Sequence, residues 1–171
     1  MVVKKMIISV LFLAIVSAVA GAAITFFNDM TAPTIAINAE REEQATLRKM
    51  FPDGEFTEIG GYTECEEVLA VYEVKGQGYI VKGTATGYNS STPIIVLVGF
   101  DQNGVTTGML PLQQQETSGY GSRCFETDFS VPAYTGKSST EEVDMLSGAT
   151  RTSDALRRIM EASFRVMEEV K

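Results

Sequence analysis

The sequence contains no histidine, no tryptophan and only two cysteines in 171 residues. Without histidine, the chain lacks the commonest general base, the usual zinc ligand and the usual haem ligand. Two cysteines are too few for an iron–sulfur cluster, which is normally held by a larger set of thiolates. If the protein performs redox chemistry, an organic cofactor must carry it, because these side chains cannot.

Positive charge is also scarce. The chain has 14 Lys and Arg against 22 Asp and Glu, a net charge of −8. Binding to nucleic acid or to anionic lipid headgroups requires clustered basic side chains. We therefore expect no nucleic-acid partner, and the composition is compatible with a domain held out in water.

One long hydrophobic run stands at the N-terminus. Residues 6–27 carry no charge, and at 1.5 Å per residue such a helix spans about 33 Å, enough for a bilayer core. Lys4 and Lys5 precede the run and place that end in the cytoplasm. We predict a cytoplasmic N-terminus and transmembrane anchor over residues 1–27 and an extracytoplasmic domain over residues 28–171.

A cleaved signal peptide is the alternative, because residues 18–20 and 20–22 both resemble cleavage sites. The apolar run is longer than a usual signal peptide and continues past these sites through Phe27, which favours a retained anchor. Both interpretations place the domain on the same side of the membrane. Small residues at 21–23 suit packing against a partner helix.

The next segment predicts a second helix. Residues 28–33 should break the first helix or cap a new one, with Pro33 in its first turn. Residues 34–50 should form an amphipathic helix, ended by the turn at 51–54. Its packed side is predicted to consist of Ile35, Ala39, Ala45, Leu47 and Met50.

Residues 55–131 have the pattern of short strands. Residues 67–75 and 78–84 are joined by a glycine-containing turn, which indicates a hairpin. The continuous apolar run at 93–100 is the candidate central strand, and the turn at 101–104 returns the chain along 105–112. An antiparallel sheet packed on flanking helices, an α+β fold, is predicted.

The C-terminal part should be a loop followed by a helix. Residues 131–140 are rich in Pro, Gly, Ser and Thr and are predicted to be a loop, and residues 153–171 show helical periodicity. The opposite, polar face of this helix carries Arg157, Arg158, Arg165 and Glu168. The predicted buried face consists of Leu156, Ile159, Met160, Ser163, Val166, Met167 and Val170.

The segment before this helix, residues 144–153, reads Asp-Met-Leu-Ser-Gly-Ala-Thr-Arg-Thr-Ser. Small residues and hydroxyls ahead of a helix leave backbone N–H groups and a threonine hydroxyl available to an anion. Ser147, or the amides of Ala149 and Thr150, are candidates to hydrogen-bond a phosphate. The alternative is a simple capped helix start, with Ser147 or Ser153 as the N-cap.

A second loop, residues 113–121, reads Gln-Gln-Gln-Glu-Thr-Ser-Gly-Tyr-Gly. Two glycines around an aromatic residue after a strand suggest a place where backbone comes close to another group. Alone, the pattern also fits a plain surface turn.

Together these two segments resemble a known family. Asp-x-x-Ser-Gly-Ala-Thr at 144–150 resembles the attachment sequence of the FMN-binding subunits of the Rnf and Nqr respiratory complexes. The Glu-Thr-x-Gly-x-Gly segment at 116–121 is similar to one that lies near the flavin in that family. Ser118 and Tyr120 stand where the family more often has proline and leucine.

The resemblance implies specific roles for residues. A flavin transferase would link the phosphate of FMN to Thr150. The implied cofactor-binding residues in the attachment sequence are Asp144, Leu146, Ser147, Gly148, Ala149 and Thr150, of which Asp144 and Ser147 belong to what the transferase recognises. The second segment contributes Glu116, Thr117, Gly119 and Gly121.

The implied function is that of an electron carrier with no catalytic residues and no net reaction of its own. It would be the FMN-binding G subunit of an Rnf ferredoxin:NAD⁺ oxidoreductase that translocates Na⁺ or H⁺, with membrane subunits of the A to E types as partners. The alternatives are the C subunit of a Na⁺-translocating NADH:quinone oxidoreductase, which is generally longer, and an anchored non-redox binding module.

The sequence also bears on a hydrolase function and on the state of the two cysteines. A hydrolase with Ser147 or Thr150 as nucleophile is disfavoured, because histidine and a Gly-x-Ser-x-Gly elbow are absent. Cys65 and Cys124 are compatible with a disulfide outside the cell and equally with two free thiols.

Overall fold

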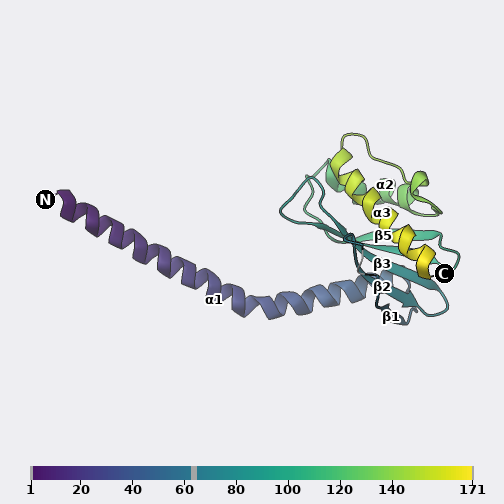
Figure 1. Cartoon of the computed structure of the whole chain (residues 1–171), viewed down its shortest axis with the longest axis horizontal. Coiled ribbons are helices and arrows are strands. Elements are labelled where there is room, and N and C mark those ends of the chain that lie inside the picture. The colour runs from purple at the N-terminus through teal and green to yellow at the C-terminus, as the bar shows by residue number, and fades with distance from the viewer. Residues whose placement is uncertain (1, 63–64, 171) are drawn as a thin grey trace. The chain divides into compact units, whose positions relative to one another are not determined.

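A computed structural model describes residues 2–62 and 65–170 of the chain (Figure 1). Met1, Thr63, Glu64 and Lys171 lie outside the described residues, and Lys171 is the last residue of the predicted C-terminal helix. The chain divides into two units, Met1–Glu42 and Glu43–Lys171. The predicted boundary between anchor and domain at residues 27 and 28 concerns the membrane and stays a prediction.

The first unit is helical. Helix α1, Val2–Met50, begins in this unit and continues into the second. Among the described residues, Val3–Met50 is the one helix that is long and apolar enough to cross a membrane, with a mean hydropathy of 2.7 in its most apolar window. The helix agrees with the predicted transmembrane anchor.

The predicted helix break at residues 28–33 is wrong, because α1 runs through Pro33 without interruption. A proline inside a helix removes one backbone hydrogen bond and costs about 3 kcal/mol. The hydroxyl of Thr31 donates to the carbonyls of Phe27 (2.8 Å) and Asn28 (3.2 Å) in the turn before the proline. Long helical segments on both sides carry the helix across this local cost.

The second unit is built on a five-stranded sheet in the order β1-β2-β3-β4-β5, with every neighbouring pair antiparallel. The four predicted strands are confirmed within a residue or two of their bounds. The additional strand, β1, was not predicted because it is short and largely exposed. The strands are β1 Phe56–Ile59, β2 Val68–Val74, β3 Gly78–Ala85, β4 Ile94–Asp101 and β5 Thr106–Gln113.

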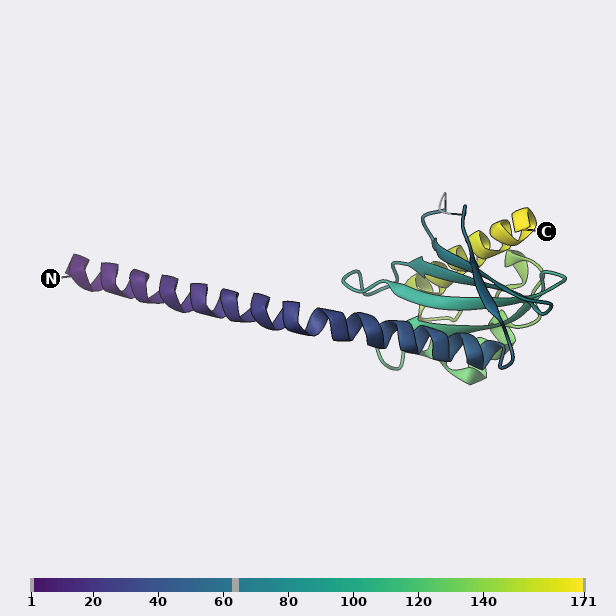
Figure 2. The same cartoon turned by 90° about the horizontal axis from the view of Figure 1, so that it is seen from below.

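Both faces of the sheet are covered, which explains the continuous apolar run in β4. Val96 and Val98 point into the larger core, shared with helix α3, whereas Leu97 points into a smaller core on the other face. That smaller core is closed by Leu47 from the end of α1 and by Phe51. Figures 1 and 2 show α3 lying across the sheet.

The part of α1 that belongs to the second unit packs on the sheet through Leu47 and Met50. Of the predicted packed side, Leu47 is buried and Met50 is half-buried, while Ile35, Ala39 and Ala45 are exposed. The prediction for those three residues is therefore wrong. Ile35 and Ala39 lie in the first unit, so the amphipathic pattern was extended too far toward the N-terminus. Ala45 lies in the second unit but on the exposed side of α1.

A half-buried polar group fastens the end of α1 to the sheet. The hydroxyl of Tyr72 on β2 donates to Glu43 Oε1 (2.7 Å), and Lys82 Nζ on β3 lies 2.5 Å from Glu43 Oε2. Burial, with the added effect of the neighbouring Glu43 carboxylate, raises the pKa of Tyr72. One carboxylate on α1 thus holds two adjacent strands.

Glu43→Ala should lower the free energy of unfolding of the second unit by about 1–2 kcal/mol, because it leaves the Tyr72 hydroxyl and the Lys82 ammonium without their acceptor. Urea denaturation of the detergent-solubilised protein measures the change. Glu40→Ala, an exposed acid on α1 outside this unit, is the control and should have no effect. Equal stabilities for the two variants would contradict the fastening role.

Two helices follow the sheet. Helix α2, Thr127–Tyr134, extends into the segment predicted as a loop at 131–140, although Pro132 lies inside it. Ala133 and Tyr134 are 1% and 0% exposed, so burial in the core offsets the local cost of proline. Between α2 and α3, the only helical turn within the described residues is the short 3₁₀ segment η2, Thr140–Glu142.

Helix α3, Thr150–Val170, begins three residues before its predicted start. Its predicted buried face is confirmed, with Val170 half-buried at the end. On the opposite face Arg165 and Glu168 are exposed, but Arg157 and Arg158 are half-buried. The strict period of this helix made its packing readable from sequence.

Candidate functional site

Two segments far apart in the sequence meet at a pocket of about 510 Å³. One segment follows β5 and leads into the 3₁₀ turn η1, Gly121–Phe125, and the other contains the start of α3. These are the two segments that sequence analysis selected. The pocket is lined by Tyr88, Glu116, Thr117, Tyr120, Gly121, Gly148, Ala149, Thr150, Arg151 and Thr152.

Some of the predicted site residues line the pocket, and others do not. Asp144 is 70% exposed, with Oδ2 3.8 Å from Lys137 Nζ, and Leu146 packs against the core. Ser147 and Gly119 are exposed and do not line the pocket. The predicted residues that line it are Glu116, Thr117, Gly121, Gly148, Ala149 and Thr150.

The start of α3 presents backbone donors to the pocket. Its first hydrogen bond of the i to i−4 type runs from Ser153 N to Ala149 O (2.9 Å). The N–H groups of Thr150, Arg151 and Thr152 therefore precede the helical ladder, and all three residues line the pocket. With the helix dipole and the Arg151 side chain, this arrangement favours an anion.

Two sequence predictions at this helix start are corrected. Neither serine is the N-cap: α3 begins at Thr150, and Ser153 lies inside it, where its hydroxyl accepts the N–H of Leu146 (3.1 Å). The amide of Ala149 donates to Leu146 O (3.2 Å), so it is engaged in a turn rather than available to a phosphate. Gly148 makes that turn possible with a φ of +86°, a conformation that side chains disfavour.

A buried carboxylate organises the pocket. Glu116 is 7% exposed; its Oε2 accepts from the hydroxyl of Thr152 and from Tyr88 N (3.2 Å), and its Oε1 accepts from Asn89 N (3.2 Å). These three donors come from α3 and from the loop between β3 and β4. Glu116 therefore ties together three segments around the pocket.

Two glycines give this carboxylate its space. A Cβ on Gly87 would lie 2.6 Å from Glu116 Oε1, and a Cβ on Gly121 would lie 2.8 Å from Glu116 Oε2 and 2.5 Å from Thr152 Oγ1. A side chain at Gly87 would displace Glu116, and one at Gly121 would displace both Glu116 and Thr152. Gly121, from the second segment, thus leaves room for the Glu116–Thr152 hydrogen bond.

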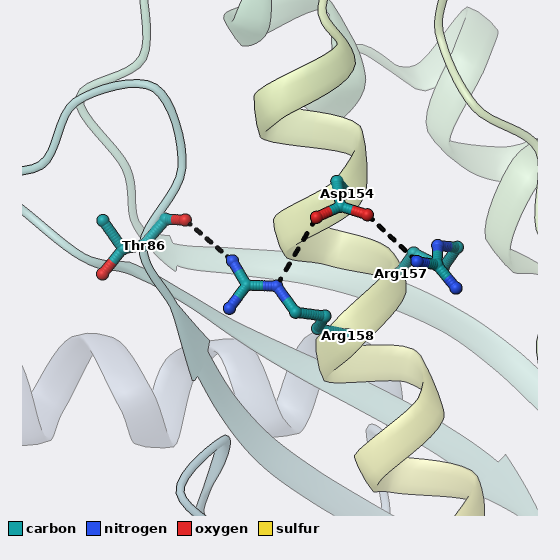
Figure 3. A network of polar contacts seen from close by, with 4 residues as sticks. All are labelled: Thr86, Asp154, Arg157 and Arg158. Atoms are coloured by element: carbon teal, nitrogen blue, oxygen red, sulfur yellow. Dashed lines mark hydrogen bonds and ion pairs between the residues drawn. The ribbon is translucent and has the colours of Figure 1, made fainter.

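An arginine on α3 holds the loop that carries Tyr88 (Figure 3). Arg158 Nη2 donates to the carbonyl of Thr86 (3.1 Å), and its Nε lies 3.7 Å from Asp154 Oδ2. Asp154 Oδ1 also accepts from Arg157 Nη2 (3.0 Å). This loop was not among the predicted site residues, because its connection to α3 spans 72 positions in the sequence.

Both cysteines are free thiols, which answers the question that the sequence left open in favour of two thiols. Cys124 is buried, and its sulfur lies 3.5 Å from Ser153 Oγ on α3. Burial raises the pKa of Cys124, so the reactive thiolate is disfavoured. Cys65 is half-buried.

Native alkylation should therefore distinguish the two thiols. In iodoacetamide near neutral pH, Cys65 should be modified first, and Cys124 should react only after denaturation. Peptide mass spectrometry over a time course measures both rates. Equal rates would contradict the buried environment of Cys124, and no labelling of either residue without reductant would indicate a disulfide.

The pocket residues fit a mononucleotide. The volume falls within the roughly 300–1,000 Å³ typical of cofactor sites. Thr150 is exposed on the pocket lining, and nothing lies within 4 Å of the Cβ position that a side chain at Gly148, also on this lining, would take. Helix amides can receive the anion, and the tyrosines offer aromatic surface.

Comparisons with known proteins agree with this chemistry. Residues 87–164 match the FMN-binding domain family, a range that contains every residue lining the pocket. The fold and site thus define an FMN-binding domain.

A relative specifies the family further. The chain is similar to the G subunit of the Na⁺-translocating ferredoxin:NAD⁺ oxidoreductase complex of Acetobacterium woodii, with 30% identity over 158 residues, which cover 82% of this chain and 74% of the relative. The chain belongs to the family of FMN-binding G subunits of Rnf-type oxidoreductase complexes.

Proposed function

We propose that this protein carries FMN in a phosphoester linkage to Thr150 and serves as an electron-carrier subunit of an Rnf-type membrane complex. The observation that supports the proposal best is the position of Thr150. Thr150 is exposed, lines the pocket and begins α3. There the amides of residues 150–152 come before the first i to i−4 hydrogen bond of the helix. Hydroxyl and anion-binding amides therefore lie at one place.

The linkage requires an activated flavin nucleotide and a flavin transferase. A phosphoanhydride bond of the donor breaks as the bond between Thr150 Oγ1 and the phosphorus of FMN forms. The part of the donor on the far side of the broken bond leaves with its own phosphate. The hydroxyl proton of Thr150 passes to a base of the transferase. FMN, once bound, supplies the redox chemistry that the side chains of this chain lack.

A covalent tether suits a flavin outside the cytoplasm. It converts loss by diffusion into a local dissociation with an effective concentration on the order of millimolar or above. Within this proposal, Gly148 allows the turn that exposes Thr150, and Arg151 adds positive charge beside the phosphate.

Residues of the attachment sequence outside the pocket have a different role in the proposal. Asp144 and Ser147 are exposed and do not line the pocket, so they are accessible to another protein. This placement supports recognition by the transferase rather than contact with the flavin. Leu146, which packs on the core, would hold the recognised segment in place.

The orientation in the membrane follows from charge. Lys4 and Lys5 precede the apolar part of α1 and favour a cytoplasmic N-terminus, with the FMN domain on the extracytoplasmic side. In this arrangement the neighbours that donate and accept electrons are the other subunits of the complex, of the A to E types. The complex would couple ferredoxin and NAD⁺ chemistry to the translocation of Na⁺ or H⁺, and the isolated subunit should catalyse no net reaction.

Flavin fluorescence on a denaturing gel tests the proposal. The full chain is expressed in membranes with and without a flavin transferase, denatured and separated by size. A fluorescent band at the mass of this chain, seen only with the transferase, is the expected result. A dark band in transferase-containing cells would overturn covalent attachment and favour a non-redox binding module.

A further inference from the structure

Two exposed tyrosines lie in the same pocket. Tyr88 and Tyr120 are each 65% exposed, and both line the cavity at the start of α3. A single exposed tyrosine needs no explanation, but exposed aromatic side chains gathered in one concave site are typical of a ligand-binding groove. In the described part of the second unit they are the two most exposed of the large apolar side chains, which are Leu69, Tyr88, Tyr120, Val131 and Met145.

The backbones of both tyrosines are fixed. The N–H of Tyr88 donates to the buried carboxylate of Glu116 (3.2 Å), and the N–H of Tyr120 donates to Thr117 O (3.1 Å) in a tight turn. Arg158 holds the adjacent loop through Thr86 O (Figure 3). The two rings therefore start from defined positions on separate segments, although both face solvent.

We propose that Tyr88 and Tyr120 are positioning residues that supply the aromatic surface on which the flavin ring system rests. The inference builds on the proposed attachment of FMN to Thr150, because a flavin tethered there is confined to the pocket that both tyrosines line. Flat aromatic rings stack favourably, and one stacked ring shifts the ratio of docked to undocked ligand by roughly tenfold in nucleic-acid sites. In this arrangement the flavin ring system covers the exposed rings of the two tyrosines.

The flavin's own fluorescence gives a readout that does not depend on activity. A phenol in contact with a photoexcited flavin quenches it: the phenol gives up one electron, the flavin accepts it, and the electron returns in the dark. Time-resolved fluorescence of the full chain, flavin-loaded by its transferase and held in detergent, therefore reports the docked fraction as a short-lived component. Visible circular dichroism reports ring docking separately.

Two substitutions at each position separate stacking from quenching. Tyr120→Leu and Tyr88→Leu should each lower the docked-to-undocked ratio by roughly tenfold and weaken the visible dichroism. Tyr120→Phe and Tyr88→Phe should keep the dichroism but lengthen the short lifetime, because phenylalanine stacks without donating an electron. Tyr79→Phe, which lies away from this pocket, is the control and should change neither signal.

The outcomes distinguish this inference from the proposed function. A flavin-loaded protein whose lifetimes and dichroism respond to none of the four pocket variants would overturn the role of the tyrosines and leave attachment intact. A wild-type protein without covalent flavin would overturn both. Because both side chains are exposed, the variants are expected to fold, and urea denaturation verifies this.

Discussion

Thr150→Ala should abolish covalent flavin attachment, taking the loaded fraction from near complete to none. The reason is chemical: alanine removes the only atom of that side chain that can form an ester with phosphate. The residue is exposed at the first position of α3, so the change leaves packing and the free energy of unfolding nearly unaltered. In-gel flavin fluorescence and the absorbance of the purified protein measure the load.

The chain offers a matched control for this substitution. Thr127 is also an exposed threonine at the first position of a helix, α2, but it does not line the pocket. Thr127→Ala should retain full flavin load, and Thr150→Ser, which keeps a hydroxyl, should retain part of it. A Thr150→Ala protein that still carries covalent flavin would place the linkage elsewhere.

Ser147 separates recognition from attachment. Because Ser147 is exposed outside the pocket, Ser147→Ala should slow modification by the transferase without preventing it. A time course of flavin incorporation, compared with Thr127→Ala, would show a reduced rate with the same endpoint.

Glu116→Ala should destabilise the second unit by about 3 kcal/mol or more. The substitution leaves the buried hydroxyl of Thr152 without its acceptor, which costs about 1–3 kcal/mol. It also removes the acceptor of the half-buried amides of Tyr88 and Asn89, which adds to this loss. Such a loss is large against a total stability of about 5–15 kcal/mol. Urea denaturation, monitored by far-ultraviolet circular dichroism, measures it.

Two companion variants define what the Glu116 result means. Glu116→Gln keeps the size of the side chain and one acceptor oxygen, so it should cost less than Glu116→Ala. Glu66→Ala, at an exposed acid, should stay within about 0.5 kcal/mol of the wild type. If Glu116→Ala were as stable as Glu66→Ala, Glu116 would not be the organising group of the pocket.

The sheet and the C-terminal helix were predictable because their patterns are local. The hairpin turns and the apolar run of β4 follow from turn residues and side-chain alternation, and the buried face of α3 follows from steps of three and four. Because both faces of the sheet are covered, β4 is apolar along almost its whole length, and this run can be recognised in the sequence.

The elements that were missed depend on contacts between distant residues. Helix α2 accommodates Pro132 because Ala133 and Tyr134 are buried by the rest of the domain, and no local signal reports that burial. The continuation of α1 through Pro33 was missed for a different reason: a proline inside a helix removes one hydrogen bond and is usually taken as a stop signal, whereas here the helix continues on both sides of it.

Part of the site could be predicted from the sequence. Composition excluded other redox groups, and the resemblance selected two of the three segments that line the pocket. What sequence could not show is that Glu116 meets Thr152 across 36 positions, or that Tyr88 comes from a third segment to the same pocket. Those connections exist only in the folded chain, where one carboxylate gathers donors from α3 and from the loop after β3.

The measurement that tests the account most directly is mass spectrometry of the peptide that contains Thr150, taken from protein purified from membranes that possess the transferase. The account predicts that this peptide carries the mass of one FMN less one water, with fragment ions that place the addition on Thr150. The same peptide found only at its unmodified mass, or with the flavin on another residue, would contradict it.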